Sequence, residues 1–365
     1  MIGTFPRIPS GCAISGMMNK KGRCMTGEDV IRSIALMHDR SNGLGGGFAA
    51  YGIYPKFKEH YAFHILYTSE KDKLMTEEYL KDKFVIDMNE PIPTRSVPNI
   101  TDAPIVWRYF LKVDSTVLNE QEKQTDETDY VVKAVMYINN CIEGAFVMSS
   151  GKNMGAFKGV GYPEDIGRFF RLEEYEGYIW TSHGRFPTNT PGWWGGAHPF
   201  CLLDWSVVHN GEISSYGINK RYLEMFGYKC ELQTDTEVVS YLVDLMHRKQ
   251  GLPLELACKV LASPLWKDID KMEPDQKELF TALRQVYASA LLNGPFSFII
   301  ANSRAMIGLN DRIKLRPMTV GKKGDMVYMA SEESAIIEIC PDLDEVWITK
   351  GGEAIIVELE EGVEI

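Results

Sequence analysis

Residues 11–16 read Gly-Cys-Ala-Ile-Ser-Gly and place Cys12 close to the start of the chain, in a stretch typical of a strand. Cys12 can act as a nucleophile if the residues before it are removed. Its new α-amino group would have an unperturbed pKa of about 7.7–8.0 and could take the thiol proton. The alternative is a structural thiol, because free cysteine is among the residue types most often buried inside proteins.

A second stretch, residues 182–190, reads Ser-His-Gly-Arg-Phe-Pro-Thr-Asn-Thr and follows a strand predicted at Tyr178–Ser182. An arginine that leaves a strand into a turn can hold a carboxylate with both arms of its guanidinium group. Arg185 is therefore a candidate residue for binding a carboxylate. The alternative is an ordinary ion pair at the protein surface.

A third stretch, residues 207–213, reads Val-Val-His-Asn-Gly-Glu-Ile. A strand that ends in Asn-Gly can aim the Asn210 amide and the Gly211 backbone N–H at one point, as the stabilisation of an oxyanion requires. Asn-Gly is also the strongest short signal for a hairpin turn. Both interpretations are open at this point.

The fourth stretch, residues 233–239, reads Gln-Thr-Asp-Thr-Glu-Val-Val. Thr234 with Glu237 three residues later predicts a capping box at the start of a helix. Asp235, at this helix start, is a candidate partner for an ammonium group. The two roles are compatible, since one helix start can serve both.

In this order, the four stretches closely resemble the class II glutamine amidotransferases, which have the N-terminal nucleophile hydrolase fold. Residues 39–43, Asp-Arg-Ser-Asn-Gly, and residues 197–199, Ala-His-Pro, are further matches. Residues 310–317, Asn-Asp-Arg-Ile-Lys-Leu-Arg-Pro, and residues 330–332, Ala-Ser-Glu, are similar in particular to the amidotransferase domains of glutamate synthases. The resemblance covers the chain up to about residue 55 and most of it after Tyr178.

The resemblance implies an α+β fold, a four-layer αββα sandwich of the N-terminal nucleophile hydrolase type. Residues 1–11 would be a propeptide and residues 12–365 the amidotransferase domain. From about residue 60 to residue 161 the sequence has a different pattern of strand-like and helix-like stretches, and we expect an inserted α+β lobe there. Its predicted strands include Ala62–Tyr67 and Val131–Tyr137.

The implied reaction is the hydrolysis of glutamine to glutamate and ammonia through a γ-glutamyl thioester. The resemblance makes Cys12 the nucleophile and its liberated amine the general base. It makes Asn210 and Gly211 the oxyanion hole.

The same resemblance implies how glutamine is held. Arg185 would bind its α-carboxylate and Asp235 its α-ammonium group. Thr188 lies where the family places a threonine that contacts the substrate.

The composition excludes several other functions. The 365 residues carry a net charge of −11 and no dense run of Lys and Arg, which argues against a nucleic-acid partner. No segment approaches the roughly 18 apolar residues of a membrane span, and no signal peptide is present, so a cytoplasmic location is expected.

The seven cysteines form no C-x-x-C pair, which indicates neither a zinc site nor a disulfide framework. Residues 43–47 follow a helix, whereas a dinucleotide-binding glycine motif follows a strand, so no metal or cofactor is expected in this chain.

No ammonia-accepting domain follows the amidotransferase-like region before Ile365. By family analogy we expect the stand-alone glutaminase subunit of an archaeal-type glutamate synthase, whose separate partner subunit carries flavin and iron–sulfur clusters. A glutaminase for another acceptor, such as a phosphosugar or a phosphoribosyl compound, is an alternative. A subunit that senses glutamine without hydrolysing it is another. The last is a cysteine hydrolase with a histidine base, for which the candidates are His183, His198 and His209.

Overall fold

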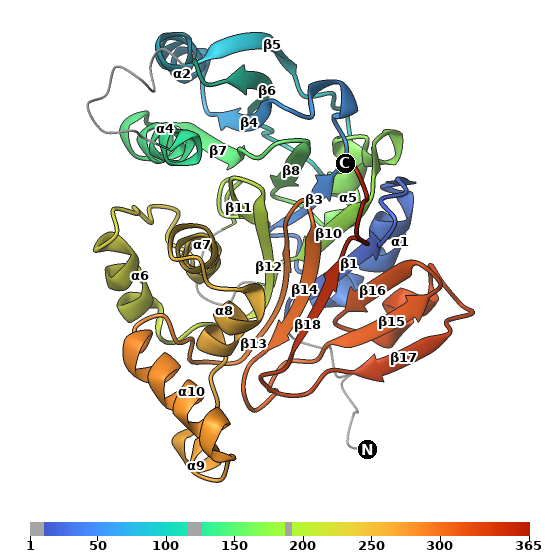
Figure 1. The fold of residues 1–365 in the computed structure, drawn as a ribbon. Helices are drawn as coiled ribbons and strands as arrows, with labels where there is room; N and C mark the ends of the chain where they lie inside the picture. The colour runs from blue at the N-terminus through green and yellow to red at the C-terminus, as the bar shows by residue number, and fades with distance from the viewer. Residues whose placement is uncertain (1–10, 115–125, 187–191) are drawn as a thin grey trace, which may run out of the picture.

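Two antiparallel β-sheets lie face to face in the middle of the molecule, and helices cover the outer face of each sheet (Figure 1). The computed structural model describes residues 11–114, 126–186 and 192–365. Helix, sheet, sheet and helix form the four layers of an αββα sandwich. The α+β fold expected from the resemblance is therefore confirmed.

The first sheet has seven strands in the order β17-β15-β16-β1-β10-β3-β8, so the strand that follows Cys12 lies at its centre. Its neighbouring strands all run antiparallel. The strands are β1 (Ala13–Asn19), β3 (Gly46–Tyr51), β8 (Met154–Gly159), β10 (Ile179–Gly184), β15 (Thr319–Lys323), β16 (Met326–Ala330) and β17 (Glu345–Ile348).

The second sheet has five antiparallel strands in the order β11-β12-β13-β14-β18. They are β11 (Phe200–Leu202), β12 (Trp205–Gly211), β13 (Phe296–Ala301), β14 (Ala305–Asn310) and β18 (Ala354–Glu358). A two-stranded sheet is formed by β2 (Met25–Thr26) and β9 (Glu176–Gly177).

Two groups of helices form the outer layers, one group on each sheet. The seven-stranded sheet is covered by α1 (Glu28–Leu36), α5 (Pro163–Phe169) and α11 (Glu333–Ile337). The five-stranded sheet is covered by α7 (Asp235–Val243) and α8 (Leu254–Leu261). Further helices beside this layer are α6 (Tyr216–Glu224), α9 (Trp266–Ile269) and α10 (Pro274–Val286). A π-helical segment, Asp244–Lys249, continues α7, and short 3-10 turns lie at His38–Arg40, Pro55–Phe57 and Leu172–Glu174.

Strand β1 is buried along its whole length, and its side chains face the two neighbouring layers in turn. Ile14 and Met18 belong to the hydrophobic cluster between the sheets, whereas Ala13 and Met17 belong to the cluster under the helices. Gly16 also faces inward, and an added Cβ there would lie 3.1 Å from a side chain of β14. The two sheets therefore approach closely at the middle of β1.

A third, four-stranded sheet forms, with the described helices α2 and α4, a lobe at the top of Figure 1, which we call the inserted lobe. Its sheet has the order β5-β6-β4-β7. The elements are β4 (Tyr61–Tyr67), α2 (Glu70–Lys83), β5 (Val85–Pro91), β6 (Ile105–Lys112), α4 (Glu127–Cys141) and β7 (Ala145–Ser149). The chain returns to the seven-stranded sheet at β8.

The strand predicted at Val131–Tyr137 is wrong, because these residues lie in the middle of α4. Val131, Val135 and Ile138 are buried, and their spacing is that of one helix face. Runs of β-branched residues favour strands locally, but packing of a whole helix face outweighs that preference.

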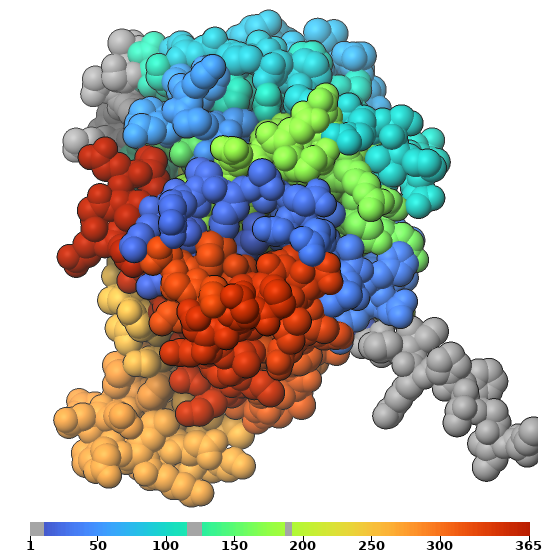
Figure 2. Space-filling view, turned by 90° about the vertical axis from the view of Figure 1, so that its right-hand side faces the viewer, coloured from blue at the N-terminus to red at the C-terminus, as the bar shows by residue number. Residues whose placement is uncertain are grey.

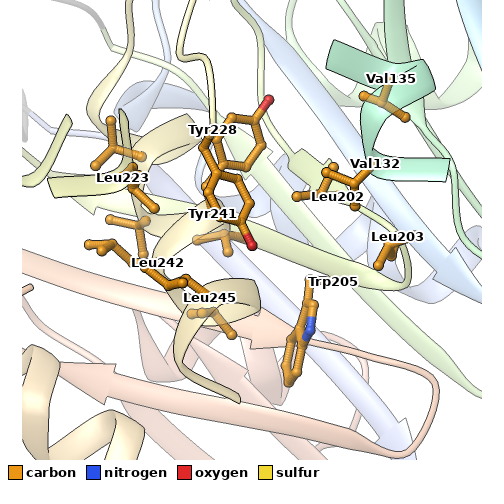
Figure 3. Close-up of a cluster of buried hydrophobic side chains, with 14 of the residues drawn as sticks. Val132, Val135, Leu202, Leu203, Trp205, Leu223, Tyr228, Tyr241, Leu242 and Leu245 are labelled. Carbon is orange, nitrogen blue, oxygen red and sulfur yellow. The ribbon is translucent and has the colours of Figure 1, made fainter. Parts of the chain in front are cut away.

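The inserted lobe shares a hydrophobic core with the helices over the five-stranded sheet. Figure 3 shows Val132 of α4 beside Leu202, with Leu203 and Trp205 on the same side of the cluster. Tyr241 of α7 belongs to the same cluster. The lobe is therefore packed onto the sandwich through buried apolar side chains.

The two ends of the described chain also pack together. Figure 2 shows the C-terminal segments, in orange and red, against the N-terminal segments in blue, with the inserted lobe in cyan above them. The pairing of β1 with β16 accounts for this contact, since Ser15 lies opposite Ala330 and Met18 opposite Val327. Within the described ranges, no helix is both long enough and apolar enough to cross a membrane.

The buried hydroxyl of Tyr51 links the two sheets. It lies 2.7 Å from Ser206 Oγ on β12, and 2.9 Å from the carbonyl oxygens of Asp204 and of Ala301 on β13. A hydroxyl has one hydrogen, so it donates to one of these oxygens at a time and can accept from Ser206. Tyr51 itself belongs to β3 of the other sheet.

We expect Tyr51→Phe to lower the free energy of unfolding by about 1–3 kcal/mol, because it leaves buried carbonyl groups without their donor. Urea unfolding followed by circular dichroism measures this change. Tyr137→Phe is the matched control, since Tyr137 is 44% exposed and should change stability by less than about 0.5 kcal/mol. Equal stability of the Tyr51 variant and the native chain would contradict a structural role for this hydroxyl.

Candidate active site

Pairing of β1 with β10 brings two of the predicted site residues together. The strands are antiparallel, with Ala13 opposite Gly184. Cys12 precedes one strand and Arg185 follows the other, so the two residues lie at the same end of the sheet. The contact is direct, because the backbone N–H of Phe186 donates a hydrogen bond of 3.3 Å to Cys12 Sγ.

Cys12 lies two residues before the inward-facing Ile14, so alternation directs its side chain into the layer between the sheets. Its carbonyl oxygen accepts a hydrogen bond of 3.3 Å from Arg40 Nε. Burial raises the pKa of the Cys12 thiol, while the Phe186 N–H and the guanidinium groups of Arg185 and Arg316 act in the opposite direction. These two arginines are therefore close enough to stabilise a thiolate.

Arg185 is held by the glycine-rich loop that follows α1. Its N–H donates to the Gly45 carbonyl at 2.9 Å, and its own carbonyl accepts from Ser41 Oγ at 3.1 Å and from Asn42 N at 3.2 Å. Gly45 has φ +158°, and an added Cβ there would lie 2.9 Å from Arg185 Cδ. In the sequence, the density of glycine in residues 43–47 is the signal that could indicate this supporting loop.

Arg185 is only 8% exposed. Burial lowers the pKa of Arg185, and the nearby Cys12 and Asp235 act to raise it. A buried guanidinium group beside a thiol and a carboxylate is a suitable site for an anionic group of a ligand.

The chain does not turn at Asn210-Gly211, so the hairpin interpretation is wrong. Both residues belong to β12 and pair with Ser297 and Phe296 of β13, which lies far along the chain. Gly211 has φ +152°, and an added Cβ would lie 2.0 Å from the carbonyl oxygen of Pro295. Close approach of the neighbouring backbone, and not a tight turn, requires glycine here.

Asn210 is fully buried at the same end of the inter-sheet layer as Cys12. Its Nδ2 donates to Ser331 Oγ at 3.3 Å, and this hydroxyl also accepts from the N–H of Ile14 at 3.1 Å. Asn210 Oδ1 has no hydrogen-bond partner among the described residues, and it lies 3.7 Å from where a Cβ on Gly11 would stand. A buried polar atom without a partner marks a place where a bound molecule can supply one.

Asp235 is the first residue of α7, and Thr234 caps this helix, since its Oγ1 accepts from Thr236 N at 3.3 Å. Asp235 Oδ2 accepts from the N–H of Ile213 at 2.8 Å. Burial acts to raise the pKa of Asp235, but His209 and the hydrogen bonds outweigh it, so the pKa lies below the ordinary value of 3.8. The group is therefore a carboxylate at neutral pH, as a partner of an ammonium group must be.

The predicted capping box is only half formed. Glu237 does not reach back to Thr234; its two carboxylate oxygens accept from the N–H groups of Glu231 and Leu232. Burial raises the pKa of Glu237 to about 7. Glu237 thus shapes the loop before the helix, because it holds the backbone that leads to Asp235.

The three candidate histidine bases all contact groups other than the Cys12 thiol. His183 Nε2 lies 2.9 Å from the carbonyl oxygen of His209, while His198 and His209 contact the Thr236 hydroxyl. Burial lowers the pKa of His183 to about 3, and lowers the pKa of His198 well below 6.5. A ring of such low basicity is a poor general base at neutral pH, and none of the three is hydrogen-bonded to the thiol in the part of the chain described.

Thr188 lies at residues 187–191, outside the described residues, so its contact with substrate stays a prediction. Among the residues that the structure describes, no group of three or more His, Cys, Asp and Glu side chains could hold a metal ion. The seven cysteines are free thiols, and Cys12 is one of the partly exposed ones.

Comparison with known families agrees with this geometry. The profile of the family described as "Glutamine amidotransferases class-II" matches residues 95–364. This stretch contains Arg185, Asn210 and Asp235, while Cys12 lies before it.

Three relatives illustrate the range of similarity. A protein of Archaeoglobus fulgidus, described only as an uncharacterized protein, is 53% identical over 352 residues, which cover 96% of this chain and 92% of the relative. A protein of Methanothermobacter thermautotrophicus, provisionally described as a glutamine amidotransferase, is 25% identical over 353 residues, or 95% of this chain and 100% of the relative. The amidophosphoribosyltransferase of Methanocaldococcus jannaschii is 26% identical over 232 residues, or 60% of this chain and 43% of the relative. Because the family profile matches most of its length, the chain belongs to the class II glutamine amidotransferases.

Proposed function

We propose that this chain hydrolyses glutamine to glutamate and ammonia, with Cys12 as the nucleophile and a γ-glutamyl thioester as the intermediate. The observation that carries the proposal is the convergence of Cys12, Arg185, Asn210 and Asp235 from four separate segments. A thiol, a cation, an amide and an anion in one place match the reacting carboxamide of glutamine and its two charged α-substituents.

Chemically, the liberated α-amino group of Cys12 would accept the thiol proton while the sulfur attacks the carboxamide carbon. The Asn210 amide and the Gly211 N–H would stabilise the negative charge that develops on the carboxamide oxygen. Collapse of this adduct breaks the C–N bond, and the proton passes to the departing ammonia. Water then attacks the thioester with the amine again as base, which yields glutamate and regenerates the thiol.

The same proposal assigns the binding of the substrate. Arg185 would hold the α-carboxylate with two parallel hydrogen bonds, and Asp235 would pair with the α-ammonium group. Thr188 would add a further contact to the substrate. The opposite charges of Arg185 and Asp235 match the opposite charges on the α-carbon of glutamine.

Removal of residues 1–11 is part of this mechanism, because the nitrogen of Cys12 is an amide in the unprocessed chain and cannot accept a proton. An added Cβ on Gly11 would lie 3.1 Å from Arg316 Nη1 and 3.7 Å from Asn210 Oδ1. Gly11 therefore lies beside residues proposed for the reaction.

As acceptor of the ammonia we propose a separate glutamate synthase subunit that carries flavin and iron–sulfur clusters, in the cytoplasm. Support comes from the similarity of residues 310–317 and 330–332 to amidotransferase domains of glutamate synthases. Both segments border the site, through Arg316 and Ser331. A phosphoribosyl acceptor is the second candidate, favoured by the relative from Methanocaldococcus jannaschii. Reconstitution with each candidate partner distinguishes them. The measurement is transfer of the amide nitrogen of glutamine into a second molecule of glutamate, beyond the one that hydrolysis releases, or into phosphoribosylamine.

We expect the active chain to begin at Cys12, with residues 1–11 removed, because the mechanism needs a free amine on the nucleophile. Intact-mass spectrometry of a preparation that releases ammonia from glutamine checks this. An active preparation that retains residues 1–11 would contradict the amine as general base. An unprocessed and inactive chain that still binds glutamine would favour the sensing subunit.

Arg185→Lys should raise the KM for glutamine by on the order of tenfold or more, since an ammonium group cannot reproduce the bidentate guanidinium contact. Ammonia release at varied glutamine concentration measures it. Arg304→Lys, on the loop between β13 and β14, is the control and should leave KM unchanged. Unchanged KM in the Arg185 variant would show that the α-carboxylate is bound elsewhere.

Asn210→Ala should lower kcat by on the order of 10²–10³-fold, as the loss of one oxyanion donor does in other enzymes. Ser297→Ala is the matched control, because Ser297 lies opposite Asn210 on β13, is fully buried, and has a hydroxyl with no hydrogen-bond partner among the residues that the structure describes. Its turnover should stay near that of the native chain, and thermal melting should show both variants folded. A folded Asn210 variant with normal kcat would remove Asn210 from the catalytic residues.

A further inference from the structure

Thr236 lies at the centre of a buried hydrogen-bond cluster under the site. It is the second residue of α7 and is fully buried. Its Oγ1 lies 2.7 Å from His198 Nε2, 3.1 Å from His209 Nδ1 and 3.2 Å from Asp235 Oδ1. One hydroxyl thus joins the start of a helix to two other segments.

The donors and acceptors of this cluster can be assigned from the chemistry of the groups. Asp235 is a carboxylate and can only accept, so the single hydroxyl hydrogen of Thr236 points to Asp235 Oδ1. The two lone pairs of the same oxygen then accept from the Nε2–H of His198 and the Nδ1–H of His209. This arrangement uses all the hydrogen-bonding capacity of the hydroxyl.

The remaining ring nitrogens agree with this assignment. His198 Nδ1 is buried without a partner among the described residues, and burial keeps this ring uncharged, so its one hydrogen lies on Nε2, toward Thr236. His183 must donate through Nε2, because its partner is the carbonyl oxygen of His209. His183 also stacks on His198, with ring centroids 3.9 Å apart.

The segment that carries His198 is itself held in place. Lys158 is buried in β8, and its Nζ donates to the carbonyl oxygens of Gly195 at 3.0 Å and Pro199 at 3.2 Å. These two carbonyls flank His198 in the chain. The imidazole therefore approaches Thr236 from a fixed backbone, and not from a free loop end.

We propose that Thr236 is a positioning residue that orients the Asp235 carboxylate for the α-ammonium group of the substrate, and so makes the site selective for α-amino acids. This inference rests on the proposed function, because it takes Asp235 as the ammonium partner. Thr236 fixes Oδ1 of that carboxylate and the N–H of Ile213 fixes Oδ2. Both oxygens are then held by donors on the protein side. Thr234 Oγ1 also lies 3.5 Å from Oδ1, so the lone pair that would face the ligand is on Oδ2.

The uncharged state of the histidines near Thr236 also favours binding of an ammonium group by Asp235. His198, which donates to Thr236, and His183, which stacks on His198, are both kept uncharged by burial, so neither places positive charge next to an incoming ammonium group. A lysine or arginine in their place would neutralise Asp235 and repel the ligand.

The test compares glutamine with glutaramate, which is glutamine without its α-amino group. The ratio of kcat/KM for the two amides measures recognition of the ammonium group alone. In Thr236→Val this ratio should fall by on the order of tenfold, because a hydrogen bond to a charged group is lost. In Thr236→Ser, which keeps the hydroxyl, the ratio should stay close to that of the native chain.

Ser240→Ala is the matched control, since Ser240 lies one turn further along α7, is fully buried, and within the described ranges its hydroxyl has no hydrogen-bond partner. It should leave the ratio unchanged. If Thr236→Val does not fold, His198→Phe removes one donor to Thr236 while keeping a ring against His183. It should lower the ratio by a smaller factor, about two- to fivefold, by the same hydrogen-bond argument.

Asp235→Asn separates this inference from the proposal on which it rests. An unchanged ratio in Asp235→Asn would show that Asp235 does not bind the ammonium group, which contradicts the proposed pocket. A lower ratio in Asp235→Asn with an unchanged ratio in folded Thr236→Val, or in His198→Phe, would overturn the role of Thr236 alone. A fall in both, with rescue by serine, is the expected result.

Discussion

The antiparallel pairing of β1 with β10 is the constraint on which the site depends. It sets Ala13 opposite Gly184 and so brings Cys12 next to Arg185. Because side chains alternate along a strand, a slip of one residue would turn Cys12 from the inter-sheet layer toward the helices. Such a slip is costly, since every residue of β1 is buried and each face packs against a different apolar layer.

A second constraint is the pairing of buried charged and polar groups at the end of the two sheets that holds the site. Arg185 and Asp235 carry opposite charges there, and each is held through backbone hydrogen bonds that a strand end or helix start supplies. Ser331 joins Asn210 to β1, and Thr236 joins Asp235 to two histidines. Buried polar groups that are linked in this way hold one geometry, because any rearrangement would leave partners unpaired.

The inserted lobe touches the site region through the chain that follows Arg185. Phe146 of β7 contacts Trp193, with ring centroids 5.0 Å apart, at the start of the segment that leads to His198. From the seven-stranded sheet, Lys158 of β8 donates to two carbonyl oxygens of the same segment. The apolar cluster around Val132 and Leu202 adds rigid support. The lobe thus packs against the backbone that carries part of the hydrogen-bond cluster at Thr236.

The sequence by itself determined the main candidates, because Cys12, Arg185, Asn210 and Asp235 each stand at a recognisable strand end or helix start. The fold class followed from the resemblance that these four stretches, in their order, bear to the class II glutamine amidotransferases. Tertiary structure decided what local patterns could not. Asn210-Gly211 has a hairpin signal but pairs with β13, and the β-branched run in α4 is helical. The roles of Thr236, Ser331 and the loop around Gly45 depend on contacts between residues tens to hundreds of positions apart. Local propensity extends over a few residues, whereas pairing and burial depend on segments that meet only in the folded chain.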